Sequence, residues 1–353
     1  MARLWGWVCL VAVLGCGDDD GGVDASSSDG GARDAGARAD AGPRPDAGPV
    51  VGDGFFPPTV SWAQPVDDAP LDAQSDDVIA WLDAEGGWGN RGVFQIDFSI
   101  EVLEADADTP RESFEPTSDF YSPDCDEVPV PRPSGGRIEG EEGYECTLDG
   151  DCHLIVHDRG AGRLYEMWRA NVSGGTFYGG CLAVWDTSRD YGDDGRGQGC
   201  TSADAAGLPI APLLFTADEV ASGTIDHAIR FILPNERIRR RVYVAPATHS
   251  TNPTSGGADA PPYGVRLRLR ADYPLETLPN DAARTVARAL QRYGMILADA
   301  GQIALTARSD HDTVAKWDGL LGPRDLQALE ITDFEMIEAG PRTDWSGDCT
   351  RVE

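Results

Sequence analysis

Positive charge is scarce in this sequence. Its 353 residues include 29 Lys or Arg against 60 Asp or Glu, which gives a formal net charge of -31, and the only lysine is Lys316. Proteins that bind nucleic acid, or that hold anionic headgroups by charge, need a basic surface that releases counterions. We therefore expect no nucleic-acid partner.

The sequence also lacks the short motifs that bind common cofactors and metals. No phosphate-binding or dinucleotide-binding glycine pattern occurs, no G-x-S-x-G surrounds Ser202, and no C-x-x-C pair offers thiolates to zinc. We expect no metal and no cofactor, with calcium as the open alternative. Asp186, Ser188 and Asp190 have the spacing of the first calcium ligands of an EF-hand, but its glycine and final acid are missing. A solvated acidic turn explains the same residues.

Only one long hydrophobic run is present. Residues 4–14 are apolar and follow Arg3, and no later run is long enough to cross a membrane. Eleven helical residues rise about 16 Å, whereas the hydrocarbon core is about 30 Å thick. The run therefore predicts an export signal and not a transmembrane helix.

The run ends at Val13-Leu14-Gly15-Cys16, which resembles the lipobox of bacterial lipoproteins. The resemblance implies that residues 1–15 are a signal peptide and that Cys16 is acylated after cleavage, so that lipid anchors the chain in a membrane. We expect an extracytoplasmic location, at the outer membrane or cell surface of a Gram-negative bacterium. The choice between inner and outer membrane stays open, and so does an ordinary signal peptide cleaved nearby.

The next segment is poor in side chains that can form a core. Residues 17–54 are mostly Asp, Ala, Gly, Ser and Pro, and burial cannot offset the entropy of ordering such a stretch. We predict a disordered tether over residues 16–58, a single β-rich domain over residues 59–342, and a C-terminal tail over residues 343–353.

Six cysteines follow the tether: Cys125, Cys146, Cys152, Cys181, Cys200 and Cys349. An even number in an exported chain predicts three disulfides, for which fifteen pairings exist. Proximity in sequence favours Cys146 with Cys152 and Cys181 with Cys200. The remaining bridge would join Cys125 to Cys349 and pin the tail to the domain.

Apolar alternation and turn residues predict mostly strands, at residues 93–102, 153–158, 163–172, 176–186, 225–233, 241–247, 264–271, 294–299 and 302–307. In residues 264–271 arginines alternate with Val and Leu, which predicts one buried and one wet face. Helices are predicted at residues 76–83, 216–223 and 280–293, the last two from their N-caps. The fold class is mainly β (β-sandwich or jelly-roll-like) with two or three short helices, and α+β is the second choice.

Seven segments are distinctive in combination: residues 65–80, 137–140, 163–166, 183–186, 201–210, 218–230 and 293–299. Together they resemble a family of uncharacterised secreted bacterial proteins, over residues 62–338. The resemblance implies one secreted domain, and it carries no activity or catalytic residue over to this chain.

Glycan cleavage is the sharpest catalytic hypothesis. It needs two carboxyl groups about 5–5.5 Å apart in retaining enzymes and about 6.5–9.5 Å apart in inverting ones. Glu166 and Asp186 lie on one face of consecutive predicted strands, and Asp204 follows in a turn. The alternative for each is a buried carboxylate that accepts hydrogen bonds from loop backbone.

A lyase would instead need a base and a cation, which Tyr165, His227, Arg230 and His249 could supply. His227 lies on the apolar face of its predicted strand, so we expect a core histidine there.

The aromatic residues Trp168, Trp185 and Tyr178 are candidates for stacking on sugar rings, and core packing is the alternative for each. Three functions stay open: a lipid-anchored carbohydrate-binding or glycan-handling module with a polysaccharide ligand, a glycan-degrading enzyme, and a structural or adhesive surface protein.

Overall fold

The computed structural model describes residues 54–148 and 150–352. The predicted signal peptide, Cys16 and the tether up to residue 53 lie outside the described residues. Within the described residues, no helix is both long and apolar enough to cross a membrane.

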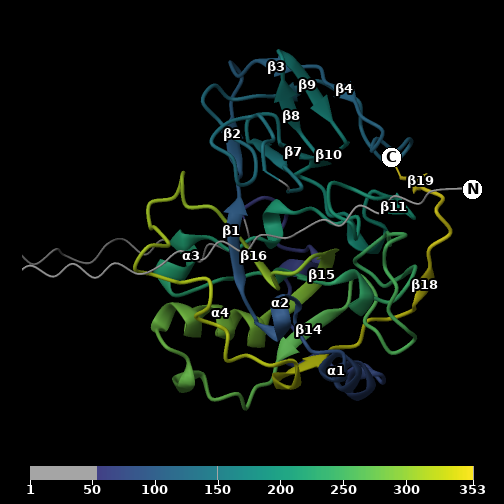
Figure 1. Cartoon of the computed structure of the whole chain (residues 1–353), viewed down its shortest axis with the longest axis vertical. Coiled ribbons are helices and arrows are strands. Elements are labelled where there is room, and N and C mark those ends of the chain that lie inside the picture. The colour runs from purple at the N-terminus through teal and green to yellow at the C-terminus, as the bar shows by residue number, and fades with distance from the viewer. Residues whose placement is uncertain (1–53, 149, 353) are drawn as a thin grey trace, which may run out of the picture. The chain divides into compact units, whose positions relative to one another are not determined.

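The largest sheet has six strands and mixed direction (Figure 1). Its order is β1 (Ile96–Ile100), β16 (Leu305–Arg308), β12 (Ile229–Leu233), β15 (Met295–Ala300), β14 (Arg266–Leu269) and β17 (Phe334–Met336). The pairs β1–β16 and β12–β15 are parallel, and the other neighbours are antiparallel.

A second sheet has four strands, in the order β10 (Cys181–Asp186), β7 (Arg163–Trp168), β6 (Leu154–Asp158) and β2 (Leu103–Ala105). Smaller sheets follow its edges and the tail: β4 (Glu115–Pro116) with β9 (Thr176–Gly179) and β8 (Asn171–Ser173), β3 (Arg111–Glu112) with β5 (Val130–Pro131), β11 (Gly197–Gln198) with β19 (Thr350–Arg351), and β13 (Val242–Tyr243) with β18 (Thr343–Asp344).

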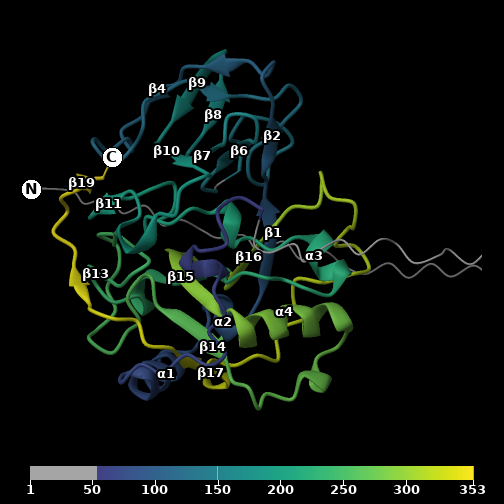
Figure 2. The ribbon, with the colours of Figure 1, turned by 180° about the vertical axis from the view of Figure 1, so that it is seen from behind.

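The described residues contain four α-helices: α1 (Ser75–Ala84), α2 (Gly89–Gly92), α3 (Ala217–Ser222) and α4 (Asp281–Arg292). Short 3-10 helices add η1 (Ser61–Ala63), η2 (Gly192–Asp194), η3 (Ala211–Leu213), η4 (Asn235–Arg237), η5 (Leu275–Thr277) and η6 (Ile331–Asp333). The predicted caps are present, because Thr216 and Glu219 form a capping box and the Asn280 side chain accepts from the Ala283 N–H. Helix α4 packs on β14 and α1 on β17 (Figure 2). The prediction of a mainly β fold with short helices is confirmed.

The four-stranded sheet separates two apolar clusters. Side chains alternate along β7, so that Leu164 enters the main core while Tyr165 and Met167 enter a smaller cluster on the other face. Successive side chains of a strand point to opposite faces, and here an apolar cluster covers each face.

The predicted wet face of residues 264–271 holds for Arg270, which is exposed, but is wrong for Arg266 and Arg268. Arg266 and Arg268 are both only 9% exposed. Arg266 donates to the carbonyls of Ser61, Gln64 and Tyr293. Arg268 donates in the same way to carbonyls of residues 66–69 and also pairs with Glu335. The N-terminal segment covers this face, and the guanidinium groups satisfy its backbone acceptors.

This segment joins the body earlier than the residue 59 expected. Phe56 is 7% exposed, and its ring lies edge-on to Trp62 at 5.6 Å and to Trp185 at 6.4 Å between centroids. The packed chain therefore includes residues of the predicted tether.

The described cysteines form three disulfides, Cys125–Cys181, Cys146–Cys152 and Cys200–Cys349. The predicted Cys146–Cys152 pair is confirmed, whereas the predicted Cys181–Cys200 and Cys125–Cys349 pairs are wrong. Backbone pairing explains the difference: the N–H of Asp126 donates to Leu182 of β10, and β19 pairs with β11. Cys349 does fasten the tail, but to Cys200.

Candidate functional site

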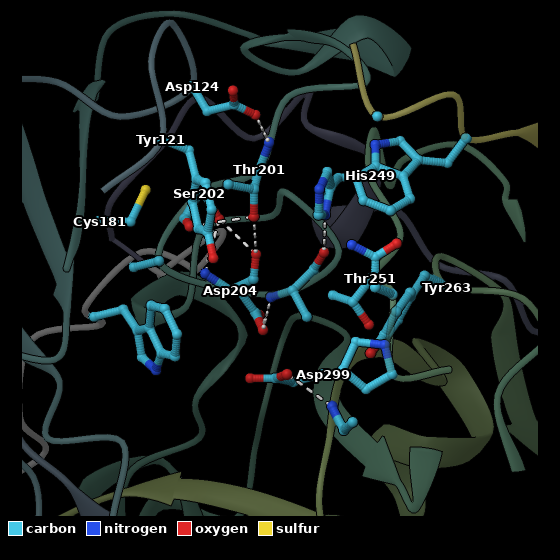
Figure 3. A pocket seen from close by; sticks show the side chains of 18 of the residues that line it. Tyr121, Asp124, Cys181, Thr201, Ser202, Asp204, His249, Thr251, Tyr263 and Asp299 are labelled. Atoms are coloured by element: carbon cyan, nitrogen blue, oxygen red, sulfur yellow. Dashed lines mark hydrogen bonds between the residues drawn. The ribbon is translucent and has the colours of Figure 1, made fainter. Parts of the chain in front are cut away.

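A pocket of about 610 Å³ lies where the ends of both large sheets meet several loops (Figure 3). Four acids line it, Asp124, Asp151, Asp204 and Asp299. Four aromatic residues line it too, Tyr121, Trp168, Tyr263 and Trp345. Such a combination of ring surfaces and hydrogen-bonding groups is typical of sites for small polar ligands.

Residues 201–205 line one wall of the pocket, and hydrogen bonds within residues 200–208 and to Asp124 fix them. The Thr201 N–H donates to Asp124 at 2.9 Å, and the Ser202 hydroxyl donates to the Leu208 carbonyl at 2.7 Å. The same hydroxyl accepts from the Asp204 N–H at 2.9 Å, which closes a local turn.

The wall requires glycine at position 207. Gly207 has φ of +76°, and a Cβ there would lie 2.3 Å from the Thr248 hydroxyl and 2.6 Å from the Cys200 carbonyl. Any side chain would push residues 200–208 away from the loop that carries His249.

Asp299 reaches the pocket from the end of β15. The parallel pairing with β12 aligns Phe231 with Leu297 and then Ile232 with Asp299, so Ala298 is an extra residue. A bulge of this kind turns the following side chain. Asp299 thus lies near the carboxyl ends of the parallel strands β12 and β15, and α/β sheets commonly bind ligands at that end of their strands.

Arg230 of β12 lies between Asp204 and Asp299 and donates hydrogen bonds to both. Its Nη2 donates to Asp299 Oδ2 at 2.7 Å and to Asp204 Oδ1 at 3.0 Å, and its Nε donates to Asp204 Oδ2 at 3.1 Å. The side chain of Asp204 is fully buried, whereas that of Asp299 is 17% exposed. Asp299 is therefore the member of this group that a ligand can reach.

The single guanidinium of Arg230 faces the carboxyl groups of both Asp204 and Asp299, and the pKa of Asp299 is raised. Burial raises the pKa of Asp299 to about 8, with the negative charge of Asp204 as the second cause, although Arg230 opposes both. Asp299 is thus mostly protonated at neutral pH and can donate a hydrogen bond.

A second buried pair lies behind residues 200–208. His153 Nδ1 is 2.7 Å from Glu139, and its Nε2 is 3.1 Å from the Ala203 carbonyl. Burial alone would lower the pKa of His153, but the carboxylate of Glu139 raises it to about 9. The protonated ring therefore donates to both partners and holds Ala203 in place.

His249 and Tyr263 line the opposite wall, as Figure 3 shows. Burial lowers the pKa of His249 to about 4, so its ring is neutral, and Nδ1 donates to the Ala205 carbonyl at 2.7 Å. Tyr263 is fully buried, and its hydroxyl, although beside Thr251, has no partner of normal hydrogen-bond geometry among the described residues.

Two tryptophans border the pocket and are held by neighbouring groups. The rings of Trp345 and His249 pack in a T-shaped arrangement with 4.5 Å between their centroids, and the Arg241 guanidinium carbon lies 4.6 Å from the centroid of the Trp345 ring. Trp168 donates from Nε1 to Asp151 at 3.2 Å. Both rings are partly exposed, so apolar surface faces the pocket.

The three predicted catalytic acids are not brought together. Glu166 is fully buried outside the pocket lining and accepts from Trp185 Nε1 at 2.9 Å and from the N–H groups of Ile210 and Ala211 at 2.8 Å. Asp186 is 37% exposed and pairs with Arg163 at 2.8 Å. Of the three, Asp204 alone lines the pocket.

The predicted sugar-binding aromatic residues also separate. Trp168 lines the pocket, whereas Trp185 is 1% exposed in the main core and Tyr178 is a half-buried residue of β9 outside the lining. Alternation along β10 explains the position of Trp185, because it shares a face with Ala183.

The predicted lyase group is likewise divided. Arg230 and His249 flank the pocket, but the Tyr165 hydroxyl accepts from Arg111 at 2.7 Å in the smaller cluster. His227 is 1% exposed and lies 3.2 Å from Glu219, so the prediction of a core histidine is confirmed.

The acidic loop at residues 186–194 uses its oxygens within the chain. Asp186 accepts from the backbone and hydroxyl of Ser188, and Asp190 accepts from the Gly192 N–H. Among the described residues, the two groups with converging ligand atoms each contain a disulfide: Asp124 with Cys200 and Cys349, and Glu141 with Cys146 and Cys152. Disulfide sulfur offers no thiolate, so neither group is a metal site as it stands.

All three disulfides adjoin the pocket. Cys181 is itself a lining residue, and Asp124, Asp151 and Thr201 each lie next to a bridged cysteine. The covalent bridges therefore hold the loops that form the walls.

Sequence reasoning missed Asp151, Asp299 and Trp345 as pocket residues. One signal was available for Asp299, since an acid that directly follows the buried run of residues 295–298 lies at the end of a covered strand. No comparable signal marks Trp345, whose place depends on the Cys200–Cys349 bridge and the β13–β18 pair.

Comparison with known proteins gives no relative. No family model matches the chain, and neither a curated protein nor a solved structure matches it significantly.

Proposed function

We propose that this chain is a lipid-anchored extracytoplasmic protein that binds a carbohydrate in the pocket. One observation carries the proposal: a pocket of about 610 Å³ combines partly exposed tryptophan rings with carboxyl and amide groups on covalently held loops. A sugar ring offers apolar C–H faces to aromatic rings and hydroxyl groups to such polar side chains.

The state of Asp299 supports this ligand class. A carboxyl group that is protonated at neutral pH donates one hydrogen bond and accepts others, which matches a hydroxyl group. Asn235, Asn252 and Thr251 add neutral donors and acceptors to the same lining. The site thus offers many uncharged hydrogen bonds, as a polyhydroxyl ligand requires.

The proposed extracytoplasmic location is supported by the sequence of residues 13–16 and by the disulfides. The lipobox-like residues 13–16 support acylation, and three formed disulfides fit an oxidising compartment. A bound glycan at a membrane surface is consistent with both.

A glycan array tests the proposal. The mature chain from residue 17, exported behind a cleavable signal peptide, should bind at least one oligosaccharide class, and Trp345→Ala should remove that binding. Trp81→Ala on α1 is a matched control, because Trp81 lies outside the pocket lining. Absence of binding to every glycan would reject the proposal.

Hydrolysis of the bound glycan is the second candidate, favoured by the two different acids at the pocket. Asp299 is protonated and can act as general acid, while Asp151 is solvent-exposed and can act as base for a water molecule. Asp299→Asn should then abolish turnover and leave binding in place. Binding without turnover in the unaltered chain would reject this candidate alone.

A further inference from the structure

The pocket holds more carboxyl groups than cations. Apart from two tyrosines, its ionisable lining residues are four acids, one arginine and one histidine: Asp124, Asp151, Asp204, Asp299, Arg241 and His249. The histidine is neutral, as its lowered pKa indicates. Charge on the walls is therefore negative at neutral pH.

The lining arginine is already engaged. Arg241 Nη1 donates to Asn252 at 2.7 Å, and its Nε and Nη2 donate to the Trp345 carbonyl at 3.3 and 3.1 Å. Its guanidinium also stacks on the Trp345 ring. An anionic ligand would have to displace these contacts before it could pair with Arg241.

The acids, in contrast, are short of cations. Among the described residues Asp124 and Asp151 make no ion pair, and each accepts from a neutral donor, the Thr201 N–H and the Trp168 indole. Asp299 shares Arg230, its one basic partner in the described part of the chain, with Asp204. Among the described residues, Asp124, Asp151 and Asp299 thus have no cation of their own in direct contact, because Arg230 is shared with Asp204 and the charges of Arg196 and His153 act on Asp124 and Asp151 without an ion pair.

Two further features indicate a ligand that fills this space. Among the described residues, the hydroxyl of the fully buried Tyr263 lies beside Thr251 but has no partner of normal hydrogen-bond geometry, and Tyr263 is part of the lining. The partly exposed rings of Trp168 and Trp345 offer the faces on which cations and sugar C–H groups bind.

On the basis of the proposed carbohydrate binding, we propose that the pocket selects a saccharide that carries a protonated amine and rejects saccharides that carry carboxylates. The ammonium group supplies the charge that Asp124, Asp151 and Asp299 lack, and a uronate would add a further negative charge to the same walls.

Binding should also move a proton. A cation in the pocket favours ionised Asp299 and lowers its pKa from about 8, so a proton leaves when the ligand binds at a pH about two units below the pKa of its own amine, where the amine already carries its proton. The titratable and charged groups that face Asp299 are Arg230, Asp204, Asp151 and Tyr263, with the Ala300 N–H as a donor. An uncharged sugar would cause no such release.

Titration calorimetry with the mature chain from residue 17 tests this specificity. The probes are oligomers of glucosamine, of N-acetylglucosamine and of a uronic acid, which share a pyranose ring and differ in charge. We expect glucosamine oligomers to bind at least about tenfold more tightly than the acetylated ones. The heat should also depend on the ionisation enthalpy of the buffer, as proton release requires, and the uronate should not bind.

A variant pair separates charge from fold. Asp151→Asn should weaken glucosamine binding about tenfold and leave N-acetylglucosamine binding within about twofold. Asp193→Asn, on the exposed 3-10 helix η2 outside the pocket lining, should change neither. Equal affinity for the amine and its acetylated form, or preference for the uronate, would overturn this inference and leave carbohydrate binding standing. Failure of all three oligomers, and of every other glycan, would remove both.

Discussion

Arg230 and Asp299 lie on neighbouring parallel strands and meet at 2.7 Å beneath the pocket. The guanidinium is shared with the buried Asp204, so the three side chains act as one unit. Removal of one member leaves a buried charge without compensation, whereas an exposed pair tolerates the same change.

Arg230→Met should lower the free energy of unfolding by about 3–5 kcal/mol, because Asp204 stays buried without its cation. Arg163→Met is the matched control, since Arg163 and Asp186 form a pair in which both side chains are more than a third exposed, and it should cost less than about 1 kcal/mol. Urea unfolding of both variants measures the difference. Similar losses would show that the buried group is not a coupled unit.

Stability should fall as pH rises through the range in which Asp299 holds its proton. The pKa of Asp299 is about 8 in the folded chain and near 3.8 when unfolded, so the folded chain binds the extra proton between these values. The folded chain binds more protons than the unfolded chain there, so the stability contribution of this group decreases as pH rises across that window. Asp299→Asn should remove this slope, and parallel pH profiles of the two proteins would contradict the assignment.

Glu166→Gln should destabilise the fold by about 1–3 kcal/mol without a specific effect on the pocket. The amide nitrogen of glutamine would face the donors of Trp185, Ile210 or Ala211, which leaves a buried donor without an acceptor. Asp186→Asn, at the exposed pair, should change stability by less than about 0.5 kcal/mol. Thermal unfolding and ligand titration distinguish this result from a catalytic role, in which activity is lost and stability is kept.

Removal of the Cys200–Cys349 bridge should destabilise the fold more than removal of the Cys146–Cys152 bridge. The double variant Cys200→Ser/Cys349→Ser opens a loop of 149 residues and should lower the free energy of unfolding by about 5 kcal/mol, whereas Cys146→Ser/Cys152→Ser opens a loop of 6 residues and should lower it by about 2 kcal/mol. The Cys200→Ser/Cys349→Ser variant should also lose ligand binding, since this bridge holds the tail segment that carries Trp345. Retained binding in that variant would mean that β13–β18 pairing alone places Trp345.

Cys16→Ser should release the chain from membranes. Acyl chains supply about 0.8 kcal/mol per buried methylene, and the acidic chain has little charge attraction to anionic lipid. Fractionation measures the release, and mass spectrometry of the mature N-terminus measures the acylation. An unmodified Cys16 in the wild-type chain would contradict the lipoprotein assignment.

The features that sequence predicted well are local ones. Thr216 and Asn280 cap their helices through residues three positions away, so the signal and the structure occupy the same window. The alternation that predicted β7 and β10 likewise depends on adjacent residues.

The features that sequence missed depend on distant pairing. Arg266 is buried because residues 61–69 cover it, and Asp299 enters the pocket because β15 pairs with β12 around a bulge. Neither partner is visible within a window of neighbouring residues. The candidate site was therefore recovered only in part, through Asp204, Trp168 and His249.

The position of the disulfides gives the molecule an order of assembly. A newly made, reduced chain can form its strands and helices from apolar burial, but the three walls that meet at Cys125–Cys181, Cys146–Cys152 and Cys200–Cys349 stay untied. Under the proposed export and ligand binding, the chain would become able to hold a ligand only once its thiols have been oxidised, at the step where it leaves a reducing environment.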